Sequence, residues 1–406
     1  MNVTVDMLPD DVLLTVFSYC SHHDLIKSIQ HVCRRWEQLS NSKCLWNYIV
    51  YYPNQYTLKT EIIEMLRLSP KLQAVDLTEH DIMDDIIRAL GDFCPELRVL
   101  HLHKYMDVNL ELLKHLVVNC PGIEELTVPS EVYTDVSVLV IIKELRKLKT
   151  MIIKTPFANN NDVNIIASNF PDLEHLELLF YEIKRCDLDI LLKYKRHQLR
   201  VLRLHCSLSD DGCVLPQLSV CTRLKTLSVE GLCGGTEPIP DSFLPLKSVT
   251  TLNIKCAYFF TSSYCCAFFK TFPQVLELQV SYCEADNEII DIIALNCPLL
   301  EKITLNDGFV NDETLKRLHC LKRLNSVTIT WSSTVTDEGV KSLESVSELM
   351  HLKFSRCEKI TAGSLGIISC FTKLRVVKFI HCRAMIGITE ENFKNNMPHL
   401  SVLIEN

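Results

Sequence analysis

The sequence predicts an α/β protein in which a short helical module precedes a curved solenoid. Two observations carry this prediction. From residue 72 to residue 400 the chain repeats one pattern fourteen times: an apolar residue, two free positions, an apolar residue, one free position and an apolar residue. The first fifty residues lack that pattern and have the apolar spacing of short amphipathic helices. The spacing of apolar residues therefore fixes the expected fold class.

The repeat has a nearly constant period. Its first apolar residue falls at 72, 97, 123, 148, 173, 199, 224, 249, 275, 300, 324, 349, 374 and 400, so the thirteen intervals are each 24, 25 or 26 residues. One copy reads Leu97, Leu100 and Leu102. A period in this range with this pattern is typical of a leucine-rich-repeat solenoid, which grows by stacking and needs no closed core.

Each repeat predicts a strand followed by a helix. A helix is about 10–12 Å across and strands stack at about 4.8 Å, so a stack of such units has to curve. We expect a parallel sheet on the concave face and mostly helices on the convex face. The side chains expected in the core are Val327, Leu352 and Val377, and those expected to be exposed beside them are Thr328, Lys353 and Lys378. Gly231 to Pro245 is rich in Gly and Pro, and predicts an irregular connector.

Composition and charge narrow the class of protein. The net charge is −8 with no basic block, which argues against a nucleic-acid partner. No apolar stretch approaches the roughly 18 residues of a membrane span, and the segment from Met1 to Asp6 does not resemble a signal peptide. An odd count of 19 cysteines without CxxC spacing favours reduced, buried thiols over disulfides or structural zinc. Those at repeat-specific places are Cys94, Cys120, Cys283, Cys297, Cys357 and Cys382.

The first fifty residues predict short helices with an apolar stripe. Pro9 stands at a helix start, and acidic residues follow it in the first turn. The stripe consists of Leu8, Val12, Leu13, Val16 and Phe17. Fifty residues bury little on their own, so this many large apolar groups indicates a surface that a partner completes.

Residues 6 to 47 resemble an F-box. The matching elements are Leu8-Pro9, Val12-Leu13, Phe17-Ser18-Tyr19, Asp24-Leu25, Val32-Cys33-Arg34-Arg35-Trp36 and Leu45-Trp46. Cys20 stands where this family most often has leucine. With the repeats behind it, the chain resembles the F-box and leucine-rich-repeat family, and we divide it into an F-box (1–50), a linker and capping helix (51–70) and the solenoid (71–406).

The resemblance implies a substrate receptor of a cullin–RING ubiquitin ligase. In that family the F-box docks on a Skp-type adaptor, and the repeats capture the protein that is to be ubiquitinated. The residues at adaptor-facing or F-box core positions are then Leu8, Pro9, Val12, Leu13, Val16, Phe17, Leu25, Val32, Cys33, Trp36 and Trp46. The sequence does not separate these two roles. The resemblance implies no cofactor, and it implies a cytoplasmic or nuclear location.

Solvent-facing residues of the later repeats are candidates for target binding. They are Tyr282, Trp331, Lys353, Arg356, Lys378 and His381, with Phe180 as a weaker companion. Tyr, Trp and Arg are the residue types that anchor interfaces, and the basic members suit an acidic or phosphorylated segment. Ordinary solvated strand residues are the competing interpretation.

Other interpretations of the sequence are weaker. Cys20, His22, His23, His31 and Cys33 match no common zinc spacing. His80, His101 and His103 could form a metal or pH-sensitive site, but scattered exposed histidines are commoner. No motif of a known catalytic class is present, so an enzyme is the least favoured class. The main alternative to a ligase receptor is a non-degradative leucine-rich-repeat scaffold or inhibitor.

Overall fold

The computed structural model describes residues 5, 8–42, 44–45, 50–51, 53, 56–78, 84–102, 109–128, 138–154, 160–183, 185–208, 218–230, 244–255, 262–281, 288–306, 310–385 and 400–405. The chain forms two compact units, called here unit 1 (residues 1–176) and unit 2 (residues 177–406). Strand β6 (His175–Ile183) spans the boundary between them.

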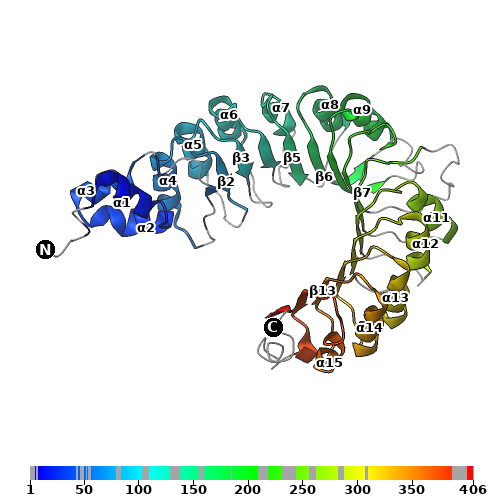
Figure 1. The fold of residues 1–406 in the computed structure, drawn as a ribbon. Helices are drawn as coiled ribbons and strands as arrows, with labels where there is room; N and C mark the ends of the chain where they lie inside the picture. Colours follow the sequence, from blue (N-terminus) through cyan, green and yellow to red (C-terminus); the bar gives the residue numbers. More distant parts are fainter. Residues whose placement is uncertain are drawn as a thin grey trace. The chain divides into compact units, whose positions relative to one another are not determined.

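Unit 1 begins with short helices and continues with strands that alternate with helices. Its helices are α1 (Asp10–Phe17), α2 (His22–Lys27), α3 (Arg34–Ser40), α4 (Lys59–Leu68), α5 (Asp84–Phe93), α6 (Leu110–Asn119), α7 (Val138–Ile142) and α8 (Asn160–Ser168), with a 3₁₀ turn at Ile29–His31. Its strands are β1 (Val50–Tyr51), β2 (Ala74–Asp76), β3 (Val99–His101), β4 (Glu125–Val128) and β5 (Thr150–Lys154). Each strand pairs in parallel with the next in chain order, and α5 to α7 lie on one side of the strands (Figure 1).

Unit 2 repeats the same arrangement. Its helices are α9 (Arg185–Lys195), α11 (Ser262–Lys270), α12 (Ile289–Asn296), α13 (Asp312–Arg317), α14 (Asp337–Ser342) and α15 (Ser364–Ile368). Its strands are β7 (Val201–Leu208), β8 (Thr226–Glu230), β9 (Thr251–Lys255), β10 (Glu277–Ser281), β11 (Lys302–Asn306), β12 (Ser326–Thr330), β13 (His351–Ser355), β14 (Val376–Ile380) and β15 (Ser401–Glu405). The 3₁₀ turns are Leu318–Cys320, Leu343–Ser345 and Arg383–Met385. The strands from β7 to β15 are parallel neighbours in chain order, and α11 to α15 lie on one side of them (Figure 1). We call the opposite side of the sheet the open face.

The predicted fold class is confirmed. Strands β2 to β15 correspond to the fourteen predicted repeats. The sequence analysis did not predict β1, which lies between the helical module and the first repeat and pairs with β2 through Val50 and Ala74. The predicted connector at Gly231 to Pro245 lies outside the described residues except for its last two positions.

The predicted strand register is confirmed for the core, and the exposed positions need a correction. Val327 and Val377 are fully buried, and Leu352 is 1% exposed. Thr328, Lys353 and Lys378 face the other way but are half-buried rather than exposed. Their side chains stand on strands about 4.8 Å apart, so each one covers the stem of its neighbour.

The last repeat was predicted one residue too late. The pattern placed its first apolar residue at Leu400, but the register pairs Val402 with Val377 and Ile404 with Phe379. The inward positions are therefore 402 and 404, and the interval from the preceding repeat is 25 residues, like most others. Leu403 consequently lies beside Lys378, on the open face.

Side chains at the helix starts link neighbouring repeats. Asn311 caps α13 in a capping box with Thr314, and Thr336 caps α14. Asp312 also reaches the next repeat, where its carboxylate accepts from the Thr336 backbone N–H at 2.8 Å and from the Thr336 hydroxyl at 2.7 Å. A Cβ on Gly339 would overlap the Asp312 carboxylate. A side chain at 339 would therefore displace the Asp312 carboxylate from the position in which it binds Thr336.

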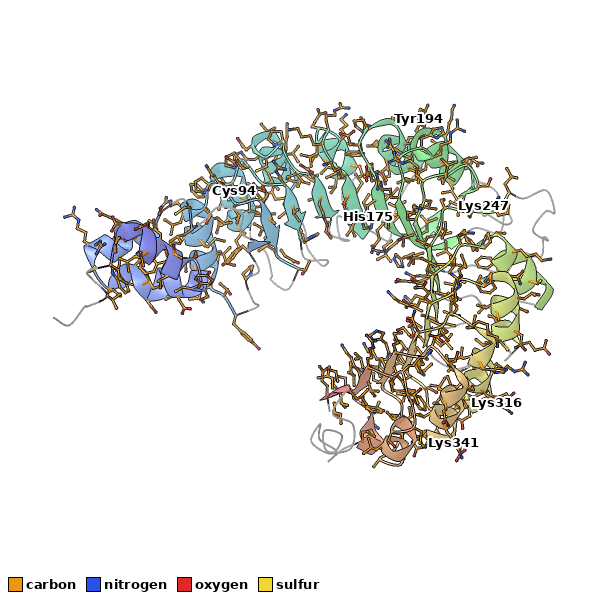
Figure 2. The ribbon with its side chains drawn as sticks, in the orientation of Figure 1. Cys94, His175, Tyr194, Lys247, Lys316 and Lys341 are labelled. Carbon is orange, nitrogen blue, oxygen red and sulfur yellow. The ribbon has the colours of Figure 1, made fainter. Side chains whose placement is uncertain are left out.

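The buried cysteines have a structural role beyond filling space. Cys120 and Cys297 are the C-cap residues of α6 and α12. Each thiol donates to carbonyls of the preceding repeat, as Cys120 does to Cys94 O at 3.3 Å and Cys297 does to Phe272 O at 3.7 Å. Burial raises the pKa of both thiols to about 12. Cys94 (Figure 2), Cys357 and Cys382 are buried in the same way, whereas Cys283 lies outside the described residues.

The described helices carry no membrane-crossing segment. Each of them is too short or too polar to span a lipid bilayer.

Candidate protein-interaction surfaces

The helices α1 to α3 form an N-terminal module with a small core of its own. Leu13 and Phe17 on α1 and Leu25 on α2 are at most 2% exposed. The Trp36 ring on α3 meets the Phe17 ring edge-on, with 5.1 Å between the ring centroids. Such aromatic pairs add about 0.5–1.5 kcal/mol beyond the area they bury. The Phe17–Trp36 contact therefore joins α1 to α3 beside the buried leucines.

The other apolar residues predicted for this module lie outside that core. Pro9, Val12, Val16, Val32 and Cys33 are exposed, and Leu8 is half-buried. Val12 and Val16 lie one turn apart on α1, so they form one apolar side of the helix, and their exposed fractions are 39% and 49%. A partner surface that covered them would gain hydrophobic free energy. The burial of these side chains thus separates the exposed residues of the module from its core residues, a distinction that the sequence did not make. Trp46 lies outside the described residues.

Tyr19 is a further outward residue that the sequence analysis did not select as a site. It lies two residues beyond the end of α1 and is 87% exposed. Tyrosine is enriched at protein interfaces. Its place three residues after Val16 in the sequence was the available signal.

An ion pair fixes the start of α1 against α3. Arg35 donates from Nε and Nη2 to Asp10 Oδ1, at 2.9 and 2.6 Å. The same guanidinium donates to the Leu8 carbonyl at 2.6 Å. Leu8 and Pro9 are therefore held in place by a side chain from another helix.

In unit 2, three predicted target residues occupy equivalent places. Trp331, Arg356 and His381 directly follow β12, β13 and β14, and each has a left-handed backbone, with φ of 58°, 54° and 51°. Each backbone N–H donates to a carbonyl of the following strand, at 2.8, 2.8 and 2.6 Å. Left-handed geometry costs a non-glycine residue about 1–2 kcal/mol. The inter-strand bonds offset this cost and leave three large side chains exposed along one edge of the sheet.

The exposed residues at this edge contact one another. The Arg356 guanidinium lies over the Trp331 ring, with Cζ 4.1 Å from the ring centroid, and Trp331 is 52% exposed. On the adjoining open face, Lys353 and Lys378 are partners in the register of β13 and β14. The structure thus brings five of the six predicted target residues together. Tyr282 lies outside the described residues, as does the side chain of Phe180.

Charged residues on the open face of earlier strands are paired. Lys255 donates to Glu230 at 2.9 Å and His205 contacts the same carboxylate at 2.8 Å, while Arg203 donates to Glu177 at 3.0 Å. Burial raises the pKa of Glu230, but the hydrogen bonds from His205 and Lys255 outweigh it and the pKa is lowered. This part of the face is therefore electrically balanced.

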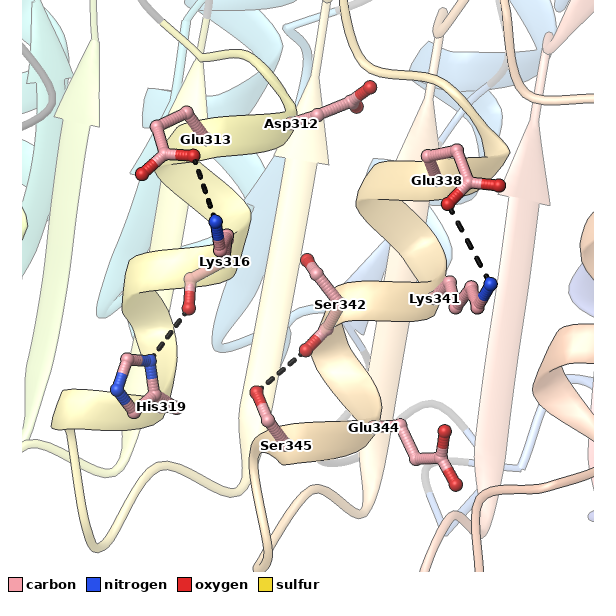
Figure 3. A pocket seen from close by; sticks show the side chains of 9 residues that line it. All are labelled: Asp312, Glu313, Lys316, His319, Glu338, Lys341, Ser342, Glu344 and Ser345. Carbon is pink, nitrogen blue, oxygen red and sulfur yellow. Dashed lines mark hydrogen bonds and ion pairs between the residues drawn. The ribbon is translucent and has the colours of Figure 1, made fainter.

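A shallow groove runs between α13 and α14 on the helix side of unit 2 (Figure 3). It holds about 930 Å³ and is lined by Asp312, Glu313, Lys316, His319, Glu338, Lys341, Ser342, Glu344 and Ser345. Lys316 pairs with Glu313 at 3.5 Å, and Lys341 pairs with Glu338 at 3.9 Å. These lining residues are all of charged or polar types, whereas hydrophobic and aromatic side chains predominate in most small-molecule sites.

The histidines considered for a metal or pH-sensitive site do not come together in the described part of the chain. His101 contacts the Thr127 hydroxyl at 2.8 Å and Glu125 at 3.5 Å, while His80 and His103 lie outside the described residues. Among the residues that the structure describes, no three His, Cys, Asp or Glu side chains are placed to hold a metal ion. The side chains of His22 and His23 are not among them.

Comparison with known proteins decides the nature of the N-terminal module. The F-box-like family model matches residues 5–51, which include α1 to α3. The chain combines an F-box-like domain with a run of leucine-rich repeats. Its F-box-like domain precedes the repeats, in the order that the sequence indicated.

Curated relatives carry the same combination. The chain is 32% identical over 111 residues to F-box/LRR-repeat protein 12 of Homo sapiens, a stretch that covers 25% of this chain and 33% of the relative. It is 32% identical over 107 residues to the Mus musculus protein of the same name, covering 24% and 32%. The chain spans about a third of the length of the curated relatives it matches.

Two solved structures are similar to this chain at lower sequence identity. An internalin from Listeria monocytogenes has a TM-score of 0.43 at 18% identity, covering 80% of this chain and 81% of the internalin. A chain of the Rad7 and Elc1 complex in yeast has a TM-score of 0.48 at 15% identity, covering 97% of this chain and 92% of that one.

Proposed function

We propose that this chain is the substrate-recognition subunit of an SCF-type ubiquitin ligase. In this proposal the F-box (1–50) docks on a Skp-type adaptor, residues 51–70 form a linker with a capping helix, and the solenoid (71–406) captures the target protein. The observation that carries the proposal is an F-box-like domain whose core is complete while Val12 and Val16 remain exposed on α1. Outward apolar side chains on a folded module favour a protein partner.

We divide the predicted F-box residues between two roles according to their burial. Leu13, Phe17 and Leu25 are core residues because they are buried, and Trp36 joins them through its ring contact with Phe17. The adaptor-facing set is Leu8, Pro9, Val12, Val16, Val32 and Cys33, to which we add Tyr19. Val12 and Val16 form the centre of this set, and Arg35 supports Leu8 through its carbonyl.

The mechanism is one of proximity, without chemistry by this chain. The adaptor connects the chain to a cullin–RING ligase, and the repeats hold the target near a charged conjugating enzyme. Holding the two together raises the effective concentration of the attacking lysine. The proposed target-binding residues are Trp331, Lys353, Arg356, Lys378 and His381, together with Tyr282. We place this function in the cytoplasm or nucleus, with no cofactor and no nucleic-acid or membrane partner.

Proximity labelling of the full chain, with and without proteasome inhibition, tests this function against the non-degradative scaffold. A substrate receptor should label proteins that accumulate only when the proteasome is inhibited, and a Val12→Glu, Val16→Glu variant should no longer cause their turnover. A set of labelled proteins whose abundance is unaffected by the inhibitor and by the variant would indicate the scaffold instead.

A further inference from the structure

The charge pattern of the open face changes at β13. Lys353 and Lys378 are register partners on neighbouring strands, so two ammonium groups project side by side from strands about 4.8 Å apart. Like charges directly opposite each other on a sheet are destabilising. Within the part of the chain that the structure describes, neither lysine has an ion pair or hydrogen bond, and both are half-buried.

Charged register pairs on earlier strands join a carboxylate to a basic residue. Glu230 is the register partner of both His205 and Lys255 and contacts both, and Glu277 is the partner of Lys302 and forms an ion pair with it. Among the described strands from β7 to β15, Lys353 and Lys378 are the one register pair with like charges. Acidic partners therefore neutralise Lys255 and Lys302, whereas Lys353 and Lys378 have no acidic partner in register.

The residues flanking the two lysines supply no carboxylate in register. Thr328 lies on one side of the pair and Leu403 on the other. Glu405, at the end of β15, is paired with Ile380 instead. The nearby strand end adds another positive charge, because Arg356 directly follows β13 and is exposed.

The Arg356 side chain is already arranged to bind an anion. Its flat face lies on the Trp331 ring, so part of its conformational freedom is lost before a ligand arrives. The N–H groups at the guanidinium edge point away from an aromatic face and match the fork geometry of a carboxylate. Within the described residues, Arg356 has no acidic partner.

We propose that the open face of β12 to β14 binds an extended acidic segment of the target protein, through carboxylates that sit on Lys353, Lys378 and Arg356. This inference rests on the proposed target-capture function and names the chemistry of what is captured. Crossing from Trp331 to His381 takes two strand steps, or about 10 Å, which equals about three residues of extended peptide. Acidic residues two or three apart in an extended segment thus reach both the lysine pair and Arg356.

A peptide-binding assay with the full chain tests the proposal. The probe is a fluorescein-labelled peptide of about ten residues that alternates Glu and Ser, long enough to cross the three strands; its partner peptide has Gln in place of each Glu. Fluorescence anisotropy should show binding of the Glu peptide, weakening as salt screens the charges, and none of the Gln peptide. Equal binding of the two peptides would overturn the proposal.

Matched variants separate recognition from folding. Lys378→Glu replaces the repulsive pair with an attractive one, so we expect a melting temperature no lower than wild type together with a loss of binding of about tenfold or more. Lys302→Gln removes a cation of the same face that already has an acid partner, and should change binding less than about twofold. Equal effects of the two variants would contradict the proposal.

Two further measurements complete the test: binding of a phosphorylated peptide and recovery of the adaptor. A Gln peptide carrying phosphoserine that binds where the Glu peptide does not would overturn the assignment of carboxylates as the ligand. Recovery of the Skp-type adaptor by the Lys378→Glu variant is measured in parallel. Loss of peptide binding with the adaptor retained supports the inference, whereas failure of wild type to recover the adaptor counts against the proposed function and not against the acidic site.

Discussion

The guanidinium of Arg356 lies over the ring of Trp331, 4.1 Å from its centroid, although the two residues are 25 positions apart in the chain. The contact exists because both follow equivalent strands of neighbouring repeats and share a left-handed backbone. Cation–π contacts contribute about 0.5–1 kcal/mol at exposed sites, and more when desolvated. A bound partner that covers Trp331, which is 52% exposed, would desolvate and strengthen this contact.

Truncating either member of this pair should weaken target capture. Trp331→Ala or Arg356→Ala removes an anchor of a type that commonly contributes about 2 kcal/mol or more. Quantitative comparison of the proteins captured by each variant and by wild type measures the effect. Adaptor recovery is the internal control and should be unchanged, because both residues lie in unit 2. An unaltered set of captured proteins would place the target elsewhere on the chain.

The inward side of β13 should not tolerate charge. Leu352 is 1% exposed, so Leu352→Asp would bury a carboxylate without a partner, at a cost of several kcal/mol. Urea unfolding of the variant should show a much lower midpoint. Thr328→Asp, on the open face beside Lys353, is the matched control and should be close to wild type. Similar destabilisation by both substitutions would mean that the two faces are assigned wrongly.

Asp312 should stabilise the junction between two repeats. Asp312→Ala leaves the Thr336 backbone N–H and hydroxyl without their acceptor, which should cost about 1–3 kcal/mol of unfolding free energy. Glu313→Ala, one residue further along the same helix, removes only surface ion pairs and should cost less than about 1 kcal/mol. Hydrogen exchange should show the loss of protection concentrated in α13 and α14. Equal unfolding free energies for the two variants would exclude this role.

Glu230 should make stability depend on pH in the acidic range. The pKa of its carboxyl is lowered in the folded chain, so folding favours the ionised form. The stabilisation is present above the unfolded-state pKa, about 4.3, and is lost as pH falls through the folded value. Urea midpoints of wild type should therefore fall below about pH 4.3 more steeply than those of Glu230→Gln. Parallel curves for the two proteins would contradict the assignment.

The sequence predicted the solenoid because its determinants are periodic. Apolar residues at a fixed spacing give the strand register directly, as the burial of Val327 and Val377 shows. The pattern failed at the last repeat, where Leu400 satisfied the first position although backbone pairing aligns Val402 with Val377. It also gave no sign of β1, because two residues carry no periodicity.

The interaction surfaces were only partly predictable. An apolar residue in a helical stripe has the same sequence signal whether it faces the core, as Phe17 does, or solvent, as Val16 does. The equivalence of Trp331 and Arg356 followed from the period. Their left-handed backbone depends on how the strands end, which apolar spacing does not encode.

The most direct test of the central claim is recovery of a Skp-type adaptor and cullin with the tagged full chain. The account predicts that wild type recovers both, and that Val12→Glu, Val16→Glu loses them while the thermal unfolding of the chain is unchanged, because both side chains already face solvent. Leu8→Ala, Pro9→Ala should also reduce recovery sharply. Recovery of adaptor and cullin at wild-type levels by the Val12→Glu, Val16→Glu chain would contradict the account.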